Sequence, residues 1–214
     1  MRLRSSRVFI ESAARDFKRT GAIAPSSRPL ALAMTRAMAP RTDRNPIAVL
    51  EVGGGTGNIT QEIVRHLHHG DHLDVYEIDP QLAGILKERV ESEPCFAKCG
   101  AKIQIHQTGI EKMVARPRYD FVISCLPFTN FQPQAVRKIF ELYRIVLKPG
   151  GICSFYEYIL VRNAARLMTR RSSRERCAGV ASVVRQTLEE TCYRKEVVFR
   201  NLPPATVYFL RFQE

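Results

Sequence analysis

The chain has 214 residues, with 45% apolar and 25% charged side chains. These values are typical of a single globular domain and exclude a disordered or fibrous chain. No apolar run approaches the roughly 20 residues of a membrane-spanning helix. The N-terminus also lacks the uninterrupted apolar centre of a secretory signal, so we expect a cytoplasmic protein.

The net charge of +12 is concentrated in two segments. Residues 1–44 carry ten basic and three acidic side chains, and residues 162–176 carry six arginines and one glutamate. This distribution favours a polyanionic partner, either an anionic membrane face or a nucleic acid. The alternative is that the surplus arginines only keep the protein soluble.

Two helices are expected in residues 1–44, ahead of a main domain at 45–214. In residues 5–20, Phe9 and Phe17 fall on one apolar face while charged side chains take the other. A basic amphipathic helix of this kind lies in a lipid interface, unless its apolar face packs on the domain. Ser26 or Ser27 is a suitable N-cap for a second helix that runs to about residue 38.

From residue 47 onward, apolar strand segments alternate with helical ones. Such alternation predicts a mostly parallel sheet covered on both faces. A basic helical stretch over about 161–191 precedes the last two strands, so the expected fold is a doubly wound, seven-stranded α/β sheet. The strands are expected at 47–52, 73–76, 103–106, 119–125, 151–156, 197–199 and 207–212, and the intervening helices at 58–67, 80–91 and 134–147.

The most informative segment is the turn EVGGGTG at 51–57, between the first expected strand and its helix. Gly53, Gly55 and Gly57 let a ligand approach the backbone more closely than a Cβ atom would permit. Glu77 follows at the end of the next strand, where a carboxylate can accept hydrogen bonds from both hydroxyls of a ribose. The pattern predicts a nucleotide-type cofactor.

Two classes of cofactor compete for this turn. Pyridine dinucleotides use glycines spaced G-x-G-x-x-G, because a pyrophosphate sits at the helix N-terminus. Here the spacing is G-x-G-x-G, and Glu51 stands two residues before the first glycine. A carboxylate there repels a phosphate but suits an ammonium and a sulfonium. The turn therefore favours S-adenosylmethionine over a nicotinamide cofactor or a purely structural turn.

The segments EVGGGTGNIT, VYEIDP and ELYRIVLKPGG resemble the class I methyltransferases over about residues 45–157. Two more segments, TGAIAPSS at 20–27 and NLPPATVY at 201–208, are similar to the bacterial phospholipid N-methyltransferases. The resemblance implies methylation of phosphatidylethanolamine toward phosphatidylcholine. It also implies a peripheral enzyme on the inner face of the membrane, with an N-terminal membrane-binding helix that covers the cofactor.

The resemblance further implies roles for individual residues. Glu51 and the three glycines would surround the methionine end of the cofactor, Glu77 would bind the ribose, and Ile78 would flank the adenine. The Gly-Asp-Ala that usually follows the third strand is absent, which leaves Thr108 or Glu111 to contact the adenine amino group. The expected cofactor-binding residues are Ser26, Glu51, Gly53, Gly55, Thr56, Gly57, Glu77, Ile78, Thr108, Ser124 and Leu126.

The fourth strand ends in the letters SCLPF at 124–128. RNA adenine N6-methyltransferases resemble this fold but carry Asn-Leu-Pro-Tyr or Asn-Pro-Pro-Tyr here, and their Asn accepts a hydrogen bond from the target amine. Cys125 occupies the Asn position, and a thiol is a poor acceptor for an amino group. We therefore expect a lipid rather than a nucleic acid as partner, with an RNA adenine N6-methyltransferase as the alternative.

Methylation of a lipid amine ends in a quaternary ammonium, whose charge aromatic faces stabilise. Phe128, Tyr156 and Tyr158 lie at the carboxyl ends of the fourth and fifth strands, positioned to face the crevice, and Tyr208 is a further candidate. Core packing is the alternative for each ring. Positioning supplies much of the rate, and desolvation lowers the pKa of the amine, so a dedicated base is not required.

A basic face after the fifth strand is expected to bind the lipid. Arg162, Arg166 and Arg170 share one side of a helix, and guanidinium groups suit lipid phosphates. With the N-terminal helix they predict a surface that grips an anionic bilayer, unless they form only a solvated charged face. The four histidines between 66 and 72 are expected to cap a helix end rather than to bind a metal.

Overall fold

The computed structural model describes residues 26–39, 45–116, 118–159 and 171–212. Five residues assigned to the membrane surface lie outside these ranges: Phe9, Phe17, Arg162, Arg166 and Arg170. The division into a segment 1–44 and a domain 45–214 stays a prediction.

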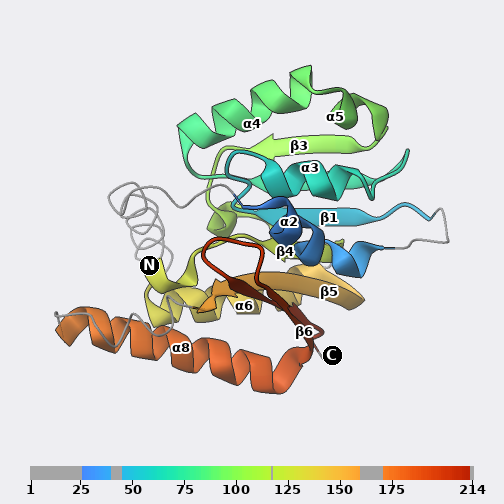
Figure 1. Ribbon diagram of the computed structural model, residues 1–214. Coiled ribbons are helices and arrows are strands. Elements are labelled where there is room, and N and C mark those ends of the chain that lie inside the picture. Colours follow the sequence, from blue (N-terminus) through green and yellow to red (C-terminus); the bar gives the residue numbers. More distant parts are fainter. Residues whose placement is uncertain (1–25, 40–44, 117, 160–170, 213–214) are drawn as a thin grey trace.

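One seven-stranded sheet runs through the molecule (Figure 1). Its order is β3-β2-β1-β4-β5-β7-β6; the first five strands are parallel, and β7 runs antiparallel to both of its neighbours. This confirms the predicted doubly wound fold. The strands are β1 (Ala48–Val52), β2 (His72–Tyr76), β3 (Lys102–His106), β4 (Tyr119–Ser124), β5 (Leu147–Tyr158), β6 (Cys192–Val198) and β7 (Ala205–Leu210).

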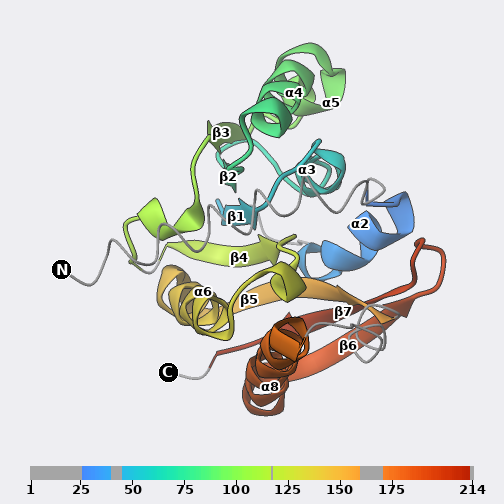
Figure 2. The same cartoon turned by 90° about the vertical axis from the view of Figure 1, so that its left-hand side faces the viewer.

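Helices cover both faces of the sheet (Figure 2). One face carries α2 (Arg28–Met34), α3 (Asn58–Val64), α4 (Pro80–Ser92) and α5 (Pro94–Lys98). The other carries α6 (Pro133–Val146) and α8 (Arg171–Thr191), which pack against each other. Three short 3₁₀ turns complete the elements: η1 (Arg36–Met38), η2 (Ile110–Lys112) and η3 (Phe128–Asn130).

The core has two parts because successive side chains of a strand point to opposite faces. On β1, Val49 packs among the buried residues of α2 and α3, whereas Leu50 packs among those of α6 and α8. Among the described residues, no helix is long and apolar enough to cross a membrane. All six cysteines are free.

Several element boundaries differ from the expected ones for local reasons. Ser27 is the N-cap of α2, since its Oγ accepts the N–H of Leu30 at 3.3 Å. The helix expected at 58–67 ends at Val64, and β6 begins at Cys192 rather than at 197. The start of β6 is polar because it is an edge strand, which hides it from an apolar pattern.

Candidate functional site

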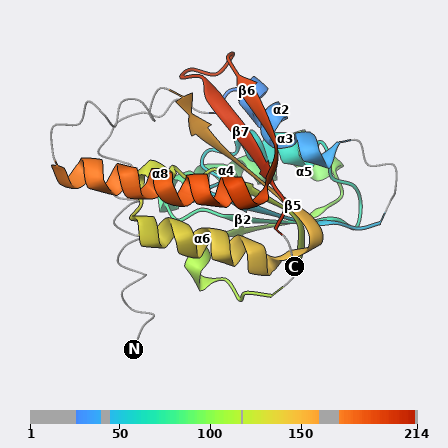
Figure 3. The same ribbon diagram turned by 90° about the horizontal axis from the view of Figure 1, so that it is seen from below.

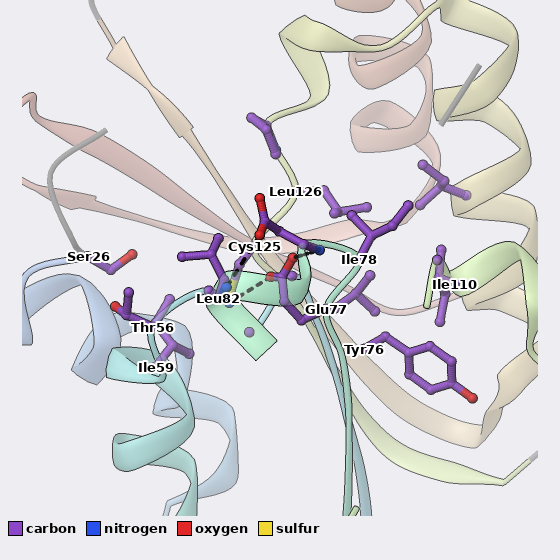
Figure 4. A pocket seen from close by; sticks show the side chains of 18 of the residues that line it. Ser26, Thr56, Ile59, Tyr76, Glu77, Ile78, Leu82, Ile110, Cys125 and Leu126 are labelled. Atoms are coloured by element: carbon purple, nitrogen blue, oxygen red, sulfur yellow. Dashed lines mark hydrogen bonds between the residues drawn. The ribbon is translucent and has the colours of Figure 1, made fainter. Parts of the chain in front are cut away.

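A cavity of about 220 Å³ opens at the carboxyl ends of β1, β2 and β4 (Figure 4). The strands that follow β1 in the chain lie on one side of it, as β2 and β3, and then on the other side, beginning with β4. Ligands of open α/β sheets bind where the strand order reverses in this way. Glu77 stands between Ser26 and Thr56 on one side and Tyr76 and Ile110 on the other. Eight of the predicted cofactor-binding residues line the cavity: Ser26, Gly53, Gly55, Thr56, Glu77, Ile78, Thr108 and Leu126.

The glycine turn leaves room beside the cavity. Gly55 has a φ of +55°, and a Cβ atom built on it meets no atom within 4 Å. Gly53, with a φ of +81°, would place a Cβ 3.3 Å from a methyl group of Leu126. Gly57 does not line the cavity, because the space beside it is filled by Leu86, 2.7 Å from the Cβ position. The first two glycines therefore face the cavity, while the third lets the start of α3 approach Leu86 of α4.

Glu77 is a fixed hydrogen-bond acceptor in the middle of the cavity. Its carboxylate accepts the N–H of Gly55 at 2.9 Å and the N–H of Asp79 at 2.8 Å (Figure 4). Burial raises the pKa of Glu77, and the two N–H donors oppose that shift. A carboxylate has about four acceptor sites, so two bonds leave capacity for ligand hydroxyls.

Arg89 on α4 holds the turn from behind. Its guanidinium donates to the carbonyl of Thr56 and to Oδ1 of Asn58, and it forms an ion pair of 2.6 Å with Glu93. The Asn58 amide in turn donates to the carbonyl of Ser26 at 3.1 Å. The turn is thereby tied both to α4 and to the segment that leads into α2.

Glu51 lies under the turn and is completely buried. Neither of its carboxylate oxygens has a hydrogen-bond partner among the described residues. Burial raises the pKa of Glu51 to about 8; the nearby hydroxyl of Thr60 opposes this rise, and the charge of Glu77 adds to it. The carboxyl is not among the lining residues, and with this pKa it is mostly protonated near neutral pH in the ligand-free protein. A cationic ligand close by would lower the pKa of Glu51 and favour its charged form.

The far side of the cavity, after β3, offers further acceptors. Oγ1 of Thr108 is buried without a partner among the described residues, and Thr108 lines the cavity. Both carboxylate oxygens of Glu111 are also buried and unpaired in the described part of the chain. They lie against Gly109, which lines the cavity, whereas Glu111 itself does not. An unsatisfied buried acceptor is costly, so these atoms mark a place for a donor.

Of the four aromatic residues predicted to face the crevice, Tyr156 lines the cavity and the other three do not. Tyr158 packs edge-on against Tyr156, with ring centroids 5.3 Å apart. Phe128 and Tyr208 instead join the core around Phe155, at 5.5 and 5.2 Å. The reason is strand alternation, which turns Phe155 and Tyr156 to opposite faces.

At the end of β4, the residue that faces the cavity is one position away from the predicted one. Ser124 is buried and accepts the hydroxyl of Tyr143 at 2.8 Å, so it supports the core. Cys125, Leu126 and Pro127 line the cavity in its place. Burial raises the pKa of the Cys125 thiol well above its ordinary value, so the thiol stays neutral.

Several lining residues were not predicted. Tyr76 and Asp79 lie beside Glu77 and Ile78 in the VYEIDP segment, so their position next to predicted site residues could have identified them. Phe131 comes from the turn before α6 and Ile139 from the middle of that helix, and nothing in their local sequence marks them. No group of three histidine, cysteine or acidic side chains suited to a metal ion is present among the described residues. The remaining lining residues are Val52, Gly54, Asn58, Ile59, Leu82, Gly109 and Ile110.

A sheet of this order, with a glycine turn after β1 and a carboxylate after β2, defines the class I methyltransferase fold. The chain belongs to the S-adenosylmethionine-dependent methyltransferases, and the family model for a methyltransferase domain matches residues 49–151. It is 30% identical over 172 residues to the ornithine lipid N-methyltransferase of Singulisphaera acidiphila, which covers 78% of this chain and 77% of that protein.

Two other similarities bear on the site. The chain is 29% identical over 126 residues to a probable ribosomal RNA small subunit methyltransferase A of Methanococcoides burtonii, covering 59% of this chain but 41% of that protein. Among solved structures, the O-methyltransferase TomG of Streptomyces achromogenes, in complex with S-adenosylmethionine, aligns with a TM-score of 0.59. That alignment covers 98% of this chain and 89% of TomG at 14% identity, so it supports the similarity of the fold alone.

The cavity fits the cofactor of this class. S-adenosylmethionine, when bound, supplies an electrophilic methyl group on a positively charged sulfur. The open space at Gly55, the ordered acceptor Glu77 and the unpaired carboxyl of Glu51 suit a ligand with a ribose and a positive charge.

Proposed function

We propose that this protein methylates the primary amine of a membrane lipid, with phosphatidylethanolamine as substrate and phosphatidylcholine as the final product. The observation that carries the proposal is the similarity to a lipid N-methyltransferase over more than three quarters of both chains. An ornithine side chain and an ethanolamine head group both present a primary amine, so one chemistry serves either lipid.

We assign the cofactor contacts to residues on both sides of Glu77. Gly53 and Gly55 admit the methionine end. Glu51, ionised when the cationic ligand lowers its pKa, balances positive charge from below the turn. Glu77 accepts the ribose hydroxyls, and Thr108 or Glu111 accepts the adenine amino group. The buried, unpaired oxygens of Thr108 and Glu111 support the last assignment.

The opposite end of the cavity would hold the amine. Its lining by Cys125, Leu126, Pro127, Phe131 and Tyr156 is uncharged. Such surroundings lower the pKa of an ammonium group, which favours the neutral amine that the reaction needs. Burial raises the pKa values of Cys125 and Tyr156 well above the ordinary range, so neither serves as a general base near neutral pH. The chain contributes desolvation and positioning, with the ring of Tyr156 beside the cationic product.

We further propose a peripheral position on the cytoplasmic membrane face. The net charge of +12 supports this proposal, as does the basic segment around Arg162, Arg166 and Arg170. The N-terminal segment with Phe9 and Phe17 would lie in the lipid interface.

An RNA adenine methyltransferase is the second candidate. The match to a ribosomal RNA methyltransferase favours it, although that match extends over less than half of the relative's length. Cys125 opposes it, because this residue replaces the acceptor that an adenine amine requires.

The test is methyl transfer from labelled S-adenosylmethionine to three substrates offered separately: vesicles with phosphatidylethanolamine, vesicles with ornithine lipid, and ribosomal RNA. We expect label in the lipid extract, resolved by thin-layer chromatography into methylated phosphatidylethanolamines. Label in ornithine lipid alone would identify ornithine lipid, instead of phosphatidylethanolamine, as the substrate. Label in RNA alone would overturn the proposal. Glu77→Ala is the negative control for any transfer.

A further inference from the structure

The loop between β6 and β7, residues 199–204, exposes two large apolar side chains. Phe199 is 78% exposed and Leu202 is 84% exposed, among the highest values for apolar residues in the described chain. Single exposed apolar residues are ordinary, but a pair on one short loop is a candidate contact surface.

Hydrogen bonds connect this loop to two other parts of the fold. Asn201 is buried; its Oδ1 accepts the N–H of Ser27 at 3.2 Å, and its amide donates to the carbonyl of Pro203 at 2.7 Å. The carbonyl of Pro204 accepts the N–H of Ile159 at 2.9 Å. The loop is thereby fixed both to the start of α2 and to the end of β5.

The loop lies on the cavity side of the molecule. Because β7 is antiparallel to β5, the turn before β7 stands at the carboxyl end of β5 (Figure 3). The cavity lies at the carboxyl ends of the parallel strands, on this same side of the sheet. Ser27, which bonds Asn201, is the neighbour of Ser26 in the cavity wall. A surface that contacts Phe199 and Leu202 would therefore also face the mouth of the cavity.

Two basic side chains lie next to the loop. Arg28 follows Ser27 at the start of α2, and Arg200 belongs to the loop itself. Arg194 and Lys195 lie toward the other end of β6, and Arg36 is paired with Glu196 at 2.9 Å. The acid Glu157, near the end of β5, lies opposite Thr206. Exposed apolar side chains beside Arg28 and Arg200 suit the interface of an anionic bilayer.

We propose that the β6–β7 loop inserts Phe199 and Leu202 into a bilayer that contains anionic phospholipid, with the cavity mouth turned toward the head groups. This inference rests on the proposed lipid substrate and names the surface that would bring the site to it. The occupant is the lipid interface, rather than residues 1–25 of this chain or a second copy.

The absence of tryptophan from the sequence allows a direct test. Phe199→Trp places the one tryptophan of the full chain in the loop, where it can be excited selectively over the seven tyrosines. Vesicles of phosphatidylcholine with phosphatidylglycerol are added without cofactor. We expect the emission to shift to shorter wavelength and to be quenched by brominated acyl chains, with the response weakening in high salt. Val114→Trp, at a 79% exposed position in the loop before β4, should not respond.

Three results would overturn the inference. One is an emission spectrum that does not change when vesicles are added. This includes a spectrum that is already at short wavelength without vesicles, because another part of the chain covers the loop. Another is a shift that follows protein concentration without lipid, as a second copy would cause. A third is an equal response from Val114→Trp.

A binding measurement separates insertion from loss of folding. Removing both side chains in Phe199→Ser/Leu202→Ser should weaken vesicle binding about tenfold or more. The matched double variant Val114→Ser/Ile145→Ser, which also removes two exposed apolar side chains, should bind as the native chain does. Lipid methylation without loop insertion would refute this inference and leave the proposed function intact. Loop insertion without lipid methylation would refute the proposed function and leave the membrane contact intact.

Discussion

The carboxylate of Glu77 accepts the backbone N–H of Gly55 at 2.9 Å, so the acid after β2 and the glycine turn after β1 form one unit. Each helps to hold the other in place, besides the bonds from Arg89 to the turn and from Asp79 to Glu77. The acceptor intended for a ligand is thus already oriented by a bond from the loop that the ligand would approach.

Glu77→Gln should weaken cofactor binding more than it weakens folding. The amide replaces one acceptor oxygen with a donor, which faces an N–H group of Gly55 or Asp79. Hydrogen bonds to charged groups contribute about 1.5–3 kcal/mol each, so the Kd for S-adenosylhomocysteine should rise about tenfold or more. Titration calorimetry measures it, with exposed Glu88→Gln as the control; an unchanged Kd would refute the ribose assignment.

Two neighbouring glycines should respond differently to alanine. Gly54→Ala puts a methyl group 2.5 Å from Val75, so overpacking should lower the free energy of unfolding by about 1–3 kcal/mol. Gly55→Ala meets no neighbouring atom and costs about 1–2 kcal/mol of backbone strain, but its methyl group stands in the open space beside the cavity. Only the second should raise the Kd for cofactor strongly. Urea unfolding and calorimetry on both variants check this, and equal Kd values would contradict it.

Glu51 should make the ligand-free protein less stable as pH rises. Its pKa is about 8 in the folded chain against 4.5 in the reference state, so the folded chain holds the proton more tightly. The stability that this difference contributes is complete below pH 4.5 and is lost as pH rises toward 8. The slope is at most about 1.4 kcal/mol per pH unit.

Glu51→Gln should remove that slope, because an amide does not titrate. The difference in unfolding free energy between the variant and the native chain should therefore grow in favour of the variant from pH 5 to pH 8, roughly following the linkage relation. Urea titrations at several pH values measure it. A constant difference would show that the carboxyl is already ionised across this range.

Tyr156 should act through its ring rather than its hydroxyl. Tyr156→Phe keeps the aromatic face beside the cavity and should retain most of the turnover, whereas Tyr156→Leu should lower kcat about fivefold or more by removing a cation–π contact. Tyr158→Phe, one ring away, is the control. Equal rates for the Phe and Leu variants would place the methyl acceptor elsewhere.

The sequence predicted most elements because their signals were local. Apolar runs marked β1 and β4, and the side chain of Ser27 marked the start of α2. The register at the cavity was harder to predict, since Cys125 rather than Ser124, and Tyr156 without Phe128, face it. Those orientations depend on which face of the sheet α6 and α8 cover. Phe131 and Ile139 reach the cavity only through tertiary packing, for which a single sequence holds no pattern.

The antiparallel course of β7 has a practical consequence. It carries the chain from the β6–β7 loop back to Phe212. The described part of the chain therefore ends beside the amino ends of the parallel strands, on the side of the sheet opposite the cavity. An attachment to a sensor chip made at this end of β7 would therefore leave the cavity side free to meet a supported lipid film.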